Sequence, residues 1–258
     1  MTANETKILN VIKLAAQIIL ENGGETYRVE ETVEYIGNAF KLEEIDSIAT
    51  PTGFYLTINS NEEDSKTIVK RIKKRTINLQ KLNEVNEISR QLSQNSITLD
   101  DALIKLVKIK NSKEKHEKFS LFYEAISSAF FTLLFGGGIF EFCAAFFIGI
   151  LITLASRYFE NIHSSQFFST IISGIVLAFT SILITYIFKM GNYNHIIVGC
   201  IMPLLPGLAM TNAIRDTIRG DLISGTARAA EAILTAASLA AGAGMVIYFA
   251  HSFGILLS

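Results

Sequence analysis

The chain has 258 residues, a net charge of −1 and a mean hydropathy of +0.36. Residues 1–118 contain 18 of the 23 Lys and Arg residues and 18 of the 24 Asp and Glu residues, so the last 140 residues are very poor in charge. A soluble domain is about 25% charged. This imbalance excludes a single soluble globular domain, intrinsic disorder and a coiled coil, and the balanced total charge gives no indication of a nucleic-acid partner.

The first 118 residues predict a small cytoplasmic α+β domain. Apolar residues recur at helical spacing, and the pair Gly23-Gly24 ends the first helix. Pro51 and Gly53 disfavour a helix, and the residues after them alternate in polarity as in a strand. The expected elements are helices over 8–20, 25–40, 77–94 and 99–110 and strands over 47–60 and 66–75.

Residues 119–258 predict a transmembrane domain, so the fold class is an α-helical membrane protein with five spans after the α+β domain. Three stretches of 25 to 27 residues contain no Asp, Glu, Lys or Arg, and a helix crosses a bilayer with about 20 residues. The apolar region before them is too long for one span and is divided at Gly136-Gly137-Gly138. Buried helices of a soluble protein are the alternative, but five in succession would leave no polar face for water. The expected spans are 119–137, 140–158, 165–188, 193–213 and 229–251.

Basic residues beside the spans predict the orientation. Lysines cluster before the first span, the second connection contains Arg157, and the fourth contains Arg215, Arg219 and Arg228, whereas the third contains only Lys189. We therefore expect a multi-pass membrane protein. Its N-terminal domain would lie in the cytoplasm and its C-terminus outside.

The expected fourth span is interrupted by two prolines. Pro203 and Pro206 each lack a backbone N–H, and Gly207 adds a flexible joint. Broken backbone at membrane depth is tolerated where protein or a water-filled cavity satisfies it, and in transporters such breaks form the substrate site. The alternative is an ordinary proline kink.

Polar and ionisable residues follow this break closely. An ionisable group costs at least about 2.5 kcal/mol at the centre of a span, so such groups usually pair or line a pathway. A guanidinium suits a carboxylate, and a carboxylate suits an ammonium group or a coupling proton. An interfacial salt-bridge cluster that only anchors the loop is the alternative. The candidate substrate-binding residues are Thr211, Asn212, Arg215, Asp216, Asp221, Arg228 and Glu231.

Glu141 lies inside the second expected span, shortly after the glycine run. A buried carboxyl group can carry a proton, so Glu141 is a candidate for the coupling pathway; a hydrated position near the membrane surface is the alternative. The histidines and the two cysteines lack ligand spacing, so we expect no metal and no cofactor. The chain has no GxxxxGK[ST] run, which argues against a primary pump.

Three segments together resemble the threonine/serine exporter family. They are residues 23–30 (Gly-Gly-Glu-Thr-Tyr-Arg-Val-Glu), residues 135–138 (Phe-Gly-Gly-Gly) followed by Glu141, and residues 206–231. The resemblance covers nearly the whole chain and implies an inner-membrane secondary exporter of small hydrophilic metabolites. Full-length members carry about twice as many spans. This chain resembles the larger subunit of a split pair, of which one example is associated with succinate export.

We therefore expect a transporter subunit that exports threonine- or serine-type amino acids and is driven by an ion gradient, with a dicarboxylate such as succinate as the alternative solute. The expected partners are the small-molecule substrate, membrane lipid, and a second small five-span subunit or identical copies of this chain. No enzyme activity is expected. One rival is a membrane-anchored hydrolase with Glu25, Arg28 and Glu30 as its polar set, although the domain lacks a paired nucleophile. The other rival is a metabolite sensor.

Overall fold

The computed structural model describes residues 3–42, 44–60, 64–112, 117–162 and 166–254. The chain forms two compact units, and each unit is built from two segments of the sequence. The N-terminal unit comprises residues 1–113 and 208–229, and the apolar unit comprises residues 114–207 and 230–258. Residues 208–229, which composition alone places in the membrane half, therefore pack with the N-terminal residues.

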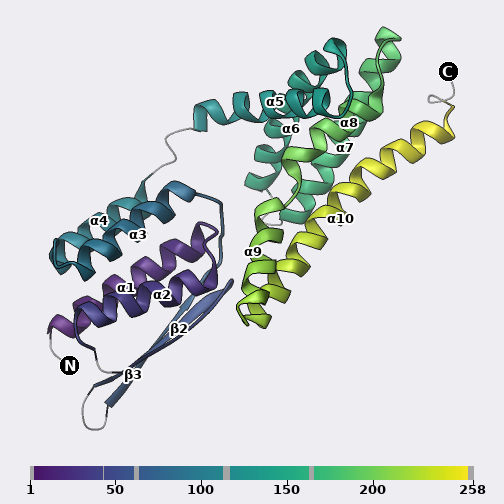
Figure 1. Ribbon diagram of the computed structural model, residues 1–258. Coiled ribbons are helices and arrows are strands. Elements are labelled where there is room, and N and C mark those ends of the chain that lie inside the picture. The colour runs from purple at the N-terminus through teal and green to yellow at the C-terminus, as the bar shows by residue number, and fades with distance from the viewer. Residues whose placement is uncertain (1–2, 43, 61–63, 113–116, 163–165, 255–258) are drawn as a thin grey trace. The chain divides into compact units, whose positions relative to one another are not determined.

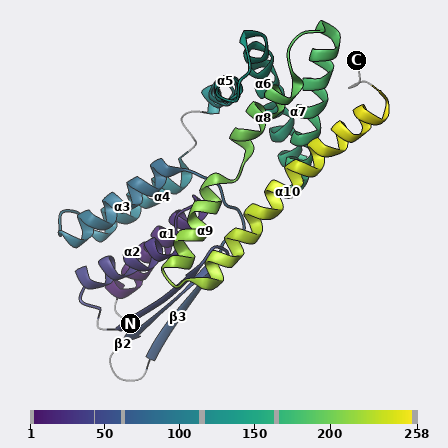
Figure 2. The same cartoon turned by 45° about the vertical axis from the view of Figure 1, so that its right-hand side comes forward.

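The N-terminal unit is layered, with a sheet below one pair of helices and a second pair above them (Figures 1 and 2). The first pair is α1 and α2, and the second is α3 and α4. Its helices are α1 (Ala3–Glu21), α2 (Thr26–Ala39), α3 (Leu79–Ser93), α4 (Leu99–Asn111), α9 (Gly207–Ile218) and the start of α10 (Leu222–Ser252). Its strands are β1 (Glu44–Thr50), β2 (Gly53–Ser60) and β3 (Asp64–Arg71).

The sheet is antiparallel in the order β1-β2-β3. Alternate side chains of β2 point to opposite faces. Phe54 and Leu56 are fully buried, whereas Tyr55 is exposed together with its cross-strand neighbours Ile48 and Val69. One face of the sheet is therefore covered by the helices of its own unit and the other is open.

The prediction of one extended strand over 47–60 is wrong, because this segment belongs to two strands. Thr50 pairs with Gly53 across a two-residue turn that contains Pro51 and Thr52. The Thr50 hydroxyl donates to the Gly53 carbonyl over 3.0 Å and closes the turn. Pro51 has no N–H for a ladder, so the residue read as a helix breaker also ends the strand.

The apolar unit contains long helices that pack through small residues. Its buried core includes Ala144, Ala145, Ile148 and Ala178. A Cβ added at Gly242 of α10 would overlap the Ile171 carbonyl oxygen, so these two backbones are in close approach. Its elements are α5 (Glu117–Leu134), α6 (Ile139–Ile162), α7 (Gln166–Phe188), α8 (Tyr193–Ile201), the 3₁₀ turn η1 (Met202–Leu204) and the rest of α10.

Five spans are not confirmed. Among the described residues, three helices are long and apolar enough to cross a membrane: Ile139–Phe159, Phe167–Phe188 and Leu222–Ser252. They correspond to the second, third and fifth expected spans, although residue 165, the expected start of the third, lies outside the described residues. The fourth is a bent pair of helices, and the first is the shorter apolar helix Phe119–Leu134. The described helices thus provide three or four spans.

Candidate functional site

Helix α9 buries polar side chains and exposes apolar ones. Asn212 and Asp216 lie one turn apart on its buried face, and Asp216 has no exposed surface. The apolar side chains Met210, Ile214 and Ile218 are exposed. A helix of a soluble protein would bury the apolar set, so the polar face of α9 must find its partners within the N-terminal unit.

Those partners lie at the turn between α1 and α2. Gly23 has a φ of +82°, which an L side chain rarely adopts. A Cβ at Gly24 would overlap the Ile19 side chain. The carbonyl oxygens of both glycines accept hydrogen bonds from side chains, and Asn212 Nδ2 donates to the Gly23 oxygen over 3.1 Å. The Gly23-Gly24 pair therefore both ends α1 and forms a docking point for α9.

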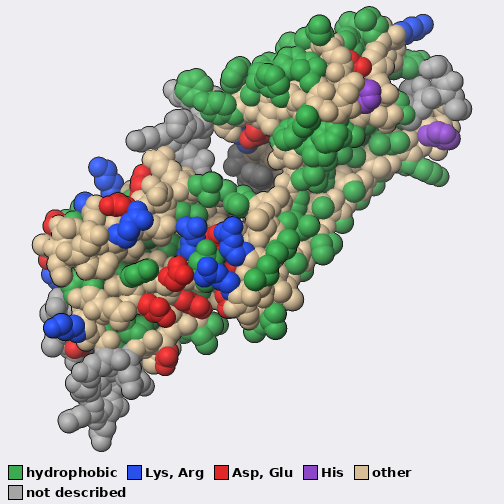
Figure 3. Space-filling view, viewed as in Figure 1, with side chains coloured by type: hydrophobic (Ala, Val, Ile, Leu, Met, Phe, Trp, Pro, Cys, Tyr) green, Lys and Arg blue, Asp and Glu red, His purple; other side chains and the backbone are tan. Residues whose placement is uncertain are grey.

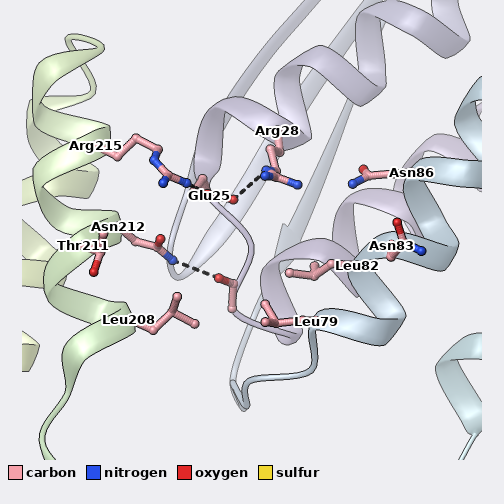
Figure 4. A pocket seen from close by; sticks show the side chains of 11 residues that line it. Glu25, Arg28, Leu79, Leu82, Asn83, Asn86, Leu208, Thr211, Asn212 and Arg215 are labelled. Carbon is pink, nitrogen blue, oxygen red and sulfur yellow. Dashed lines mark hydrogen bonds and ion pairs between the residues drawn. The ribbon is translucent and has the colours of Figure 1, made fainter.

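Glu25 precedes α2 and is 6% exposed, but its carboxylate contacts two guanidinium groups. Arg28 Nε lies 2.7 Å from Glu25 Oε2, and Arg215 Nη1 of α9 pairs with Glu25 Oε1. Figure 4 shows both guanidiniums turned toward this carboxylate. A single buried acid thus links α2 to α9 across 190 residues of sequence.

A second ion pair joins α9 to the start of α10. Arg228 Nε lies 2.9 Å from Asp216 Oδ2, and the two side chains are only 8% and 0% exposed. Arg228 Nη2 also donates to the Gly24 carbonyl over 2.7 Å. A buried pair is stable only when its remaining donors are satisfied, and the glycine turn satisfies part of that need.

Three weaker contacts continue the network toward β1. The Thr26 hydroxyl donates to Asp221 Oδ2 over 3.1 Å, and Ser224 Oγ donates to the Ala49 carbonyl over 3.4 Å. Glu30 accepts from the Ala49 N–H over 3.0 Å. Burial raises the pKa of Glu30 above its ordinary value of 4.5, partly offset by this hydrogen bond and reinforced by Asp221, Glu34 and Asp216.

A pocket of about 300 Å³ lies within the N-terminal unit, between the α2 start, α3 and α9 (Figure 4). Its wall combines two cations, one anion, three carboxamides and an apolar floor. This composition is typical of a site for a small polar molecule. The lining residues are Gly23, Glu25, Arg28, Leu79, Leu82, Asn83, Asn86, Leu208, Thr211, Asn212 and Arg215.

The predicted substrate-binding residues fall into three groups. Thr211, Asn212 and Arg215 line the pocket. Asp216, Asp221 and Arg228 belong to the buried ionic network, and none of them is a pocket-lining residue. Glu231 lies further along α10, in the apolar unit. Their part in substrate binding therefore remains a prediction, which the pocket supports most directly for the first group.

Glu141 and the proline break belong to the apolar unit. Glu141 Oε2 accepts from the Gly138 N–H over 2.9 Å, and its Oε1 accepts from the Asn192 N–H over 3.0 Å. The carboxylate thus closes the turn that starts α6 and the loop that starts α8. A role in proton coupling remains a prediction.

The helix interruption extends over the segment predicted from the prolines. The 3₁₀ turn η1 contains Pro203, Leu205 is extended, and α9 starts at Gly207 directly after Pro206. The residue before a proline is disfavoured in helical conformation, which explains the extended Leu205. Apart from its chain neighbours and its own helix backbone, no atom of the described residues lies within 4 Å of a Cβ added at Gly207.

Sequence reasoning missed four polar residues of the pocket as binding residues. Glu25 and Arg28 were considered only within the segment that carries the family resemblance and as the polar set of a hydrolase, although their place directly after two glycines was a usable signal. Asn83 and Asn86 are ordinary polar positions of an amphipathic helix and carried no signal at all. Among the described residues, no group of three or more His, Cys, Asp and Glu could hold a metal ion.

The comparison with protein families decides the assignment. Residues 10–250 match the model of the ThrE family, whose description is "Putative threonine/serine exporter". The chain belongs to this family. It is a multi-pass membrane protein, because the family is one of exporters and the chain provides helices long enough to span a membrane.

Two curated relatives extend this result. The chain is 19% identical over 239 residues to "Probable threonine/serine exporter" of Mycobacterium tuberculosis, covering 92% of this chain and 45% of that protein. It is 25% identical over 245 residues to "Probable succinate transporter subunit YjjP" of Klebsiella aerogenes, covering 91% of this chain and 92% of that protein. The chain thus spans less than half of the first relative and nearly all of the second. No solved structure matches.

Proposed function

We propose that this chain is a subunit of a secondary transporter that exports small hydrophilic metabolites of the threonine and serine type, driven by an ion gradient. Family membership supports the transport class. The observation that carries the proposal is the pocket, where Arg215 and Asn212 of the broken span meet Glu25 and Arg28 of the N-terminal residues. Guanidinium, carboxylate and carboxamide groups together suit an amino acid.

The second candidate solute is a dicarboxylate such as succinate. The Klebsiella relative, which has nearly the same length as the matched region, is named as a succinate transporter subunit. Two guanidiniums could take two carboxylates, but the carboxylate of Glu25 lies between them and opposes a second negative charge.

We also propose that the transporter is completed by a second subunit, either a small five-span protein or another copy of this chain. The chain matches only 45% of the mycobacterial exporter, and the Klebsiella relative is named as a subunit. The proposed orientation is a cytoplasmic N-terminal unit and an external C-terminus in the inner cell membrane. Cysteine accessibility in intact cells tests it, with Cys143 first replaced because it is exposed.

A flux assay tests the function. The protein is reconstituted with and without its proposed partner into liposomes that contain labelled threonine, serine or succinate, and efflux is followed with and without an ion gradient. The expected result is gradient-dependent efflux of threonine and serine that Arg215→Lys reduces about tenfold, because lysine cannot reproduce the planar fork.

Arg90→Lys is the matched control, because Arg90 also pairs with a Glu, at 2.7 Å, but on the exposed side of α3. Wild-type efflux should survive this change. Absence of efflux for all three solutes, with the partner present, would contradict the proposed function. Efflux of succinate alone would show that the solute is a dicarboxylate and not threonine or serine.

A further inference from the structure

The pocket carries an asymmetric set of charges that indicates which group of a ligand each side chain would bind. Arg28 and Arg215 supply two positive charges and Glu25 one negative charge. Glu25 is 6% exposed and is held between the two guanidiniums. The site is therefore positive by one charge, with a fixed anion inside it.

The guanidiniums retain donors beyond those that Glu25 uses. Each guanidinium has five N–H groups in a planar fork. The ion pairs with Glu25 use Nε of Arg28 and Nη1 of Arg215. The side chain of Arg215 is 43% exposed, so an incoming carboxylate can reach its open edge without displacing Glu25. A carboxylate also has about four acceptor positions, so Glu25 can accept from an ammonium group as well.

The opposite wall supplies neutral hydrogen-bonding groups. Asn83 and Asn86 lie one turn apart on α3 and both line the pocket. In the part of the chain that the structure describes, neither carboxamide has a side-chain hydrogen bond. Figure 4 shows the Asn86 carboxamide pointing toward the Arg28 guanidinium. Leu79, Leu82 and Leu208 complete a short apolar floor.

We propose that this pocket binds a small zwitterion, with its carboxylate on Arg215 and Arg28, its ammonium group on Glu25, and its polar side chain on Asn83 and Asn86. A dicarboxylate fits less well, because its second carboxylate would meet Glu25. A purely cationic amine fits less well, because two guanidiniums border the acid. The proposal relies on the proposed function only in identifying the bound zwitterion with the exported solute.

Calorimetric titration of the full chain in detergent tests whether the ligand needs both a carboxylate and an ammonium group. The probes are L-threonine, N-acetyl-L-threonine, which lacks the ammonium group, L-threonine methyl ester, which lacks the carboxylate, and succinate. We expect threonine to bind and each of the other three to bind at least about tenfold more weakly, since each loses a charge-assisted contact or adds a repulsive one.

The location is tested by two matched substitutions on one helix. Asn86→Leu removes a pocket carboxamide, and we expect it to weaken threonine binding about tenfold. Gln80→Leu removes a carboxamide on the same helix that faces Glu84 at 2.8 Å and does not line the pocket, and it should leave the affinity unchanged. The thermal midpoint of both unliganded variants checks that each is folded.

The outcomes separate the inference from the transport function. Threonine binding that Asn86→Leu leaves unchanged, or succinate binding tighter than threonine, would overturn the inference even if efflux persists. Failure of threonine to bind in the concentration range where efflux saturates would also overturn it. If threonine binds in a way that depends on Asn86 but the protein shows no efflux, the result supports this binding site and contradicts the proposed function.

Discussion

The two units of this molecule satisfy buried polar groups in opposite ways. In the N-terminal unit, buried Glu25 and Gly24 are paired with side chains 190 and 204 residues away in sequence. In the apolar unit, hydroxyls donate to carbonyls four residues back on the same helix, as Ser181 does to Leu177 and Thr185 does to Ser181. Figure 3 shows the corresponding surfaces, with charged side chains gathered on the N-terminal unit and hydrophobic ones on the apolar helices.

This difference follows from the surroundings of each unit, which are lipid for the apolar unit and water for the N-terminal unit in the proposed arrangement. A helix in lipid must satisfy its polar groups internally, so local hydroxyl bonds and small residues at contacts are sufficient for the apolar unit. The N-terminal unit instead holds a segment of the membrane half by long-range ion pairs. Those pairs should therefore be the most sensitive part of the molecule.

The largest effect is expected from Arg228→Ala. It leaves the fully buried Asp216 carboxylate without its cation and the Gly24 carbonyl without this donor. Removing one partner of a buried pair costs about 3–5 kcal/mol, so amide hydrogen exchange in α2 and α9 should accelerate strongly in detergent.

Two variants control this prediction. Arg219→Ala changes an exposed arginine that lies 3.4 Å from Glu31 and 3.6 Å above the Tyr27 ring, and it should cost less than about 1 kcal/mol. Replacing both members of the pair with Arg228→Met and Asp216→Leu should recover much of the loss. An effect of Arg228→Ala no larger than that of Arg219→Ala would mean that the buried contacts of Arg228 with Asp216 and the Gly24 carbonyl do not hold the unit together.

A close backbone contact should give the next largest effect, in the apolar unit. Gly242→Ala places a Cβ against the Ile171 carbonyl oxygen, and overpacking of this kind costs about 1–3 kcal/mol. Gly244, two residues later on α10, has open space within 4 Å, so Gly244→Ala should be neutral or stabilising by about 0.5–1 kcal/mol. Thermal unfolding by circular dichroism compares them; equal midpoints would contradict close packing of α10 on α7.

Glu141→Gln tests the buried carboxylate that joins the start of α6 to the loop before α8 in the apolar unit. The amide oxygen can accept from only one of the two backbone donors, Gly138 N–H and Asn192 N–H, and an unsatisfied buried donor costs about 1–2 kcal/mol. Glu124→Gln should cost less, because its partners Ser120 and Thr153 are hydroxyls that can turn and accept. We expect faster amide hydrogen exchange at Gly138 and Asn192 in Glu141→Gln but not in Glu124→Gln.

The smallest effect concerns pH in the N-terminal unit. Because the pKa of Glu30 is raised above 4.5 in the folded protein, the folded state favours the protonated carboxyl. Its contribution is present below about pH 4.5 and is lost as pH rises through the folded pKa. Glu30→Gln should therefore raise the free energy of unfolding slightly near pH 8 and not near pH 4. The increase should be less than about 0.5 kcal/mol, because Glu30 is only half-buried, and the thermal midpoint at the two pH values measures it.

Glu87→Gln provides the opposite sign. Hydrogen bonds from Arg90 and Gln91 lower the pKa of Glu87 below 4.5, so its contribution is present at neutral pH and disappears as pH falls through the folded pKa. This variant should be slightly less stable near pH 7 and equal to the wild type in strong acid. The same sign for both variants would show that the surroundings of Glu30 do not oppose its ionisation.

Much of the local structure could be predicted from the sequence. The fourth helix is an example: it was predicted over 99–110 and is α4 (Leu99–Asn111), whose first turn is capped by the Thr98 hydroxyl accepting from the Asp101 N–H over 3.1 Å. The charge-free stretches predicted the long helices α7 and α10, and the division of the preceding apolar region at Gly136-Gly137-Gly138 predicted α6. The turn between β1 and β2 was missed because one proline was read only as a helix breaker.

The sequence by itself determined which residues are apolar enough for lipid and where helices begin and end, because hydrophobic periodicity, caps and prolines act over a few residues. Only the tertiary structure decided that 208–229 packs with the first 113 residues, and that Arg215 and Arg228 meet Glu25 and Asp216. Composition identified these charges as candidates. Their partners could not be read from spacing, because Arg215 and Glu25 are 190 residues apart and Arg228 and Asp216 lie on two different helices. Both pairs depend on chain topology and not on local pattern.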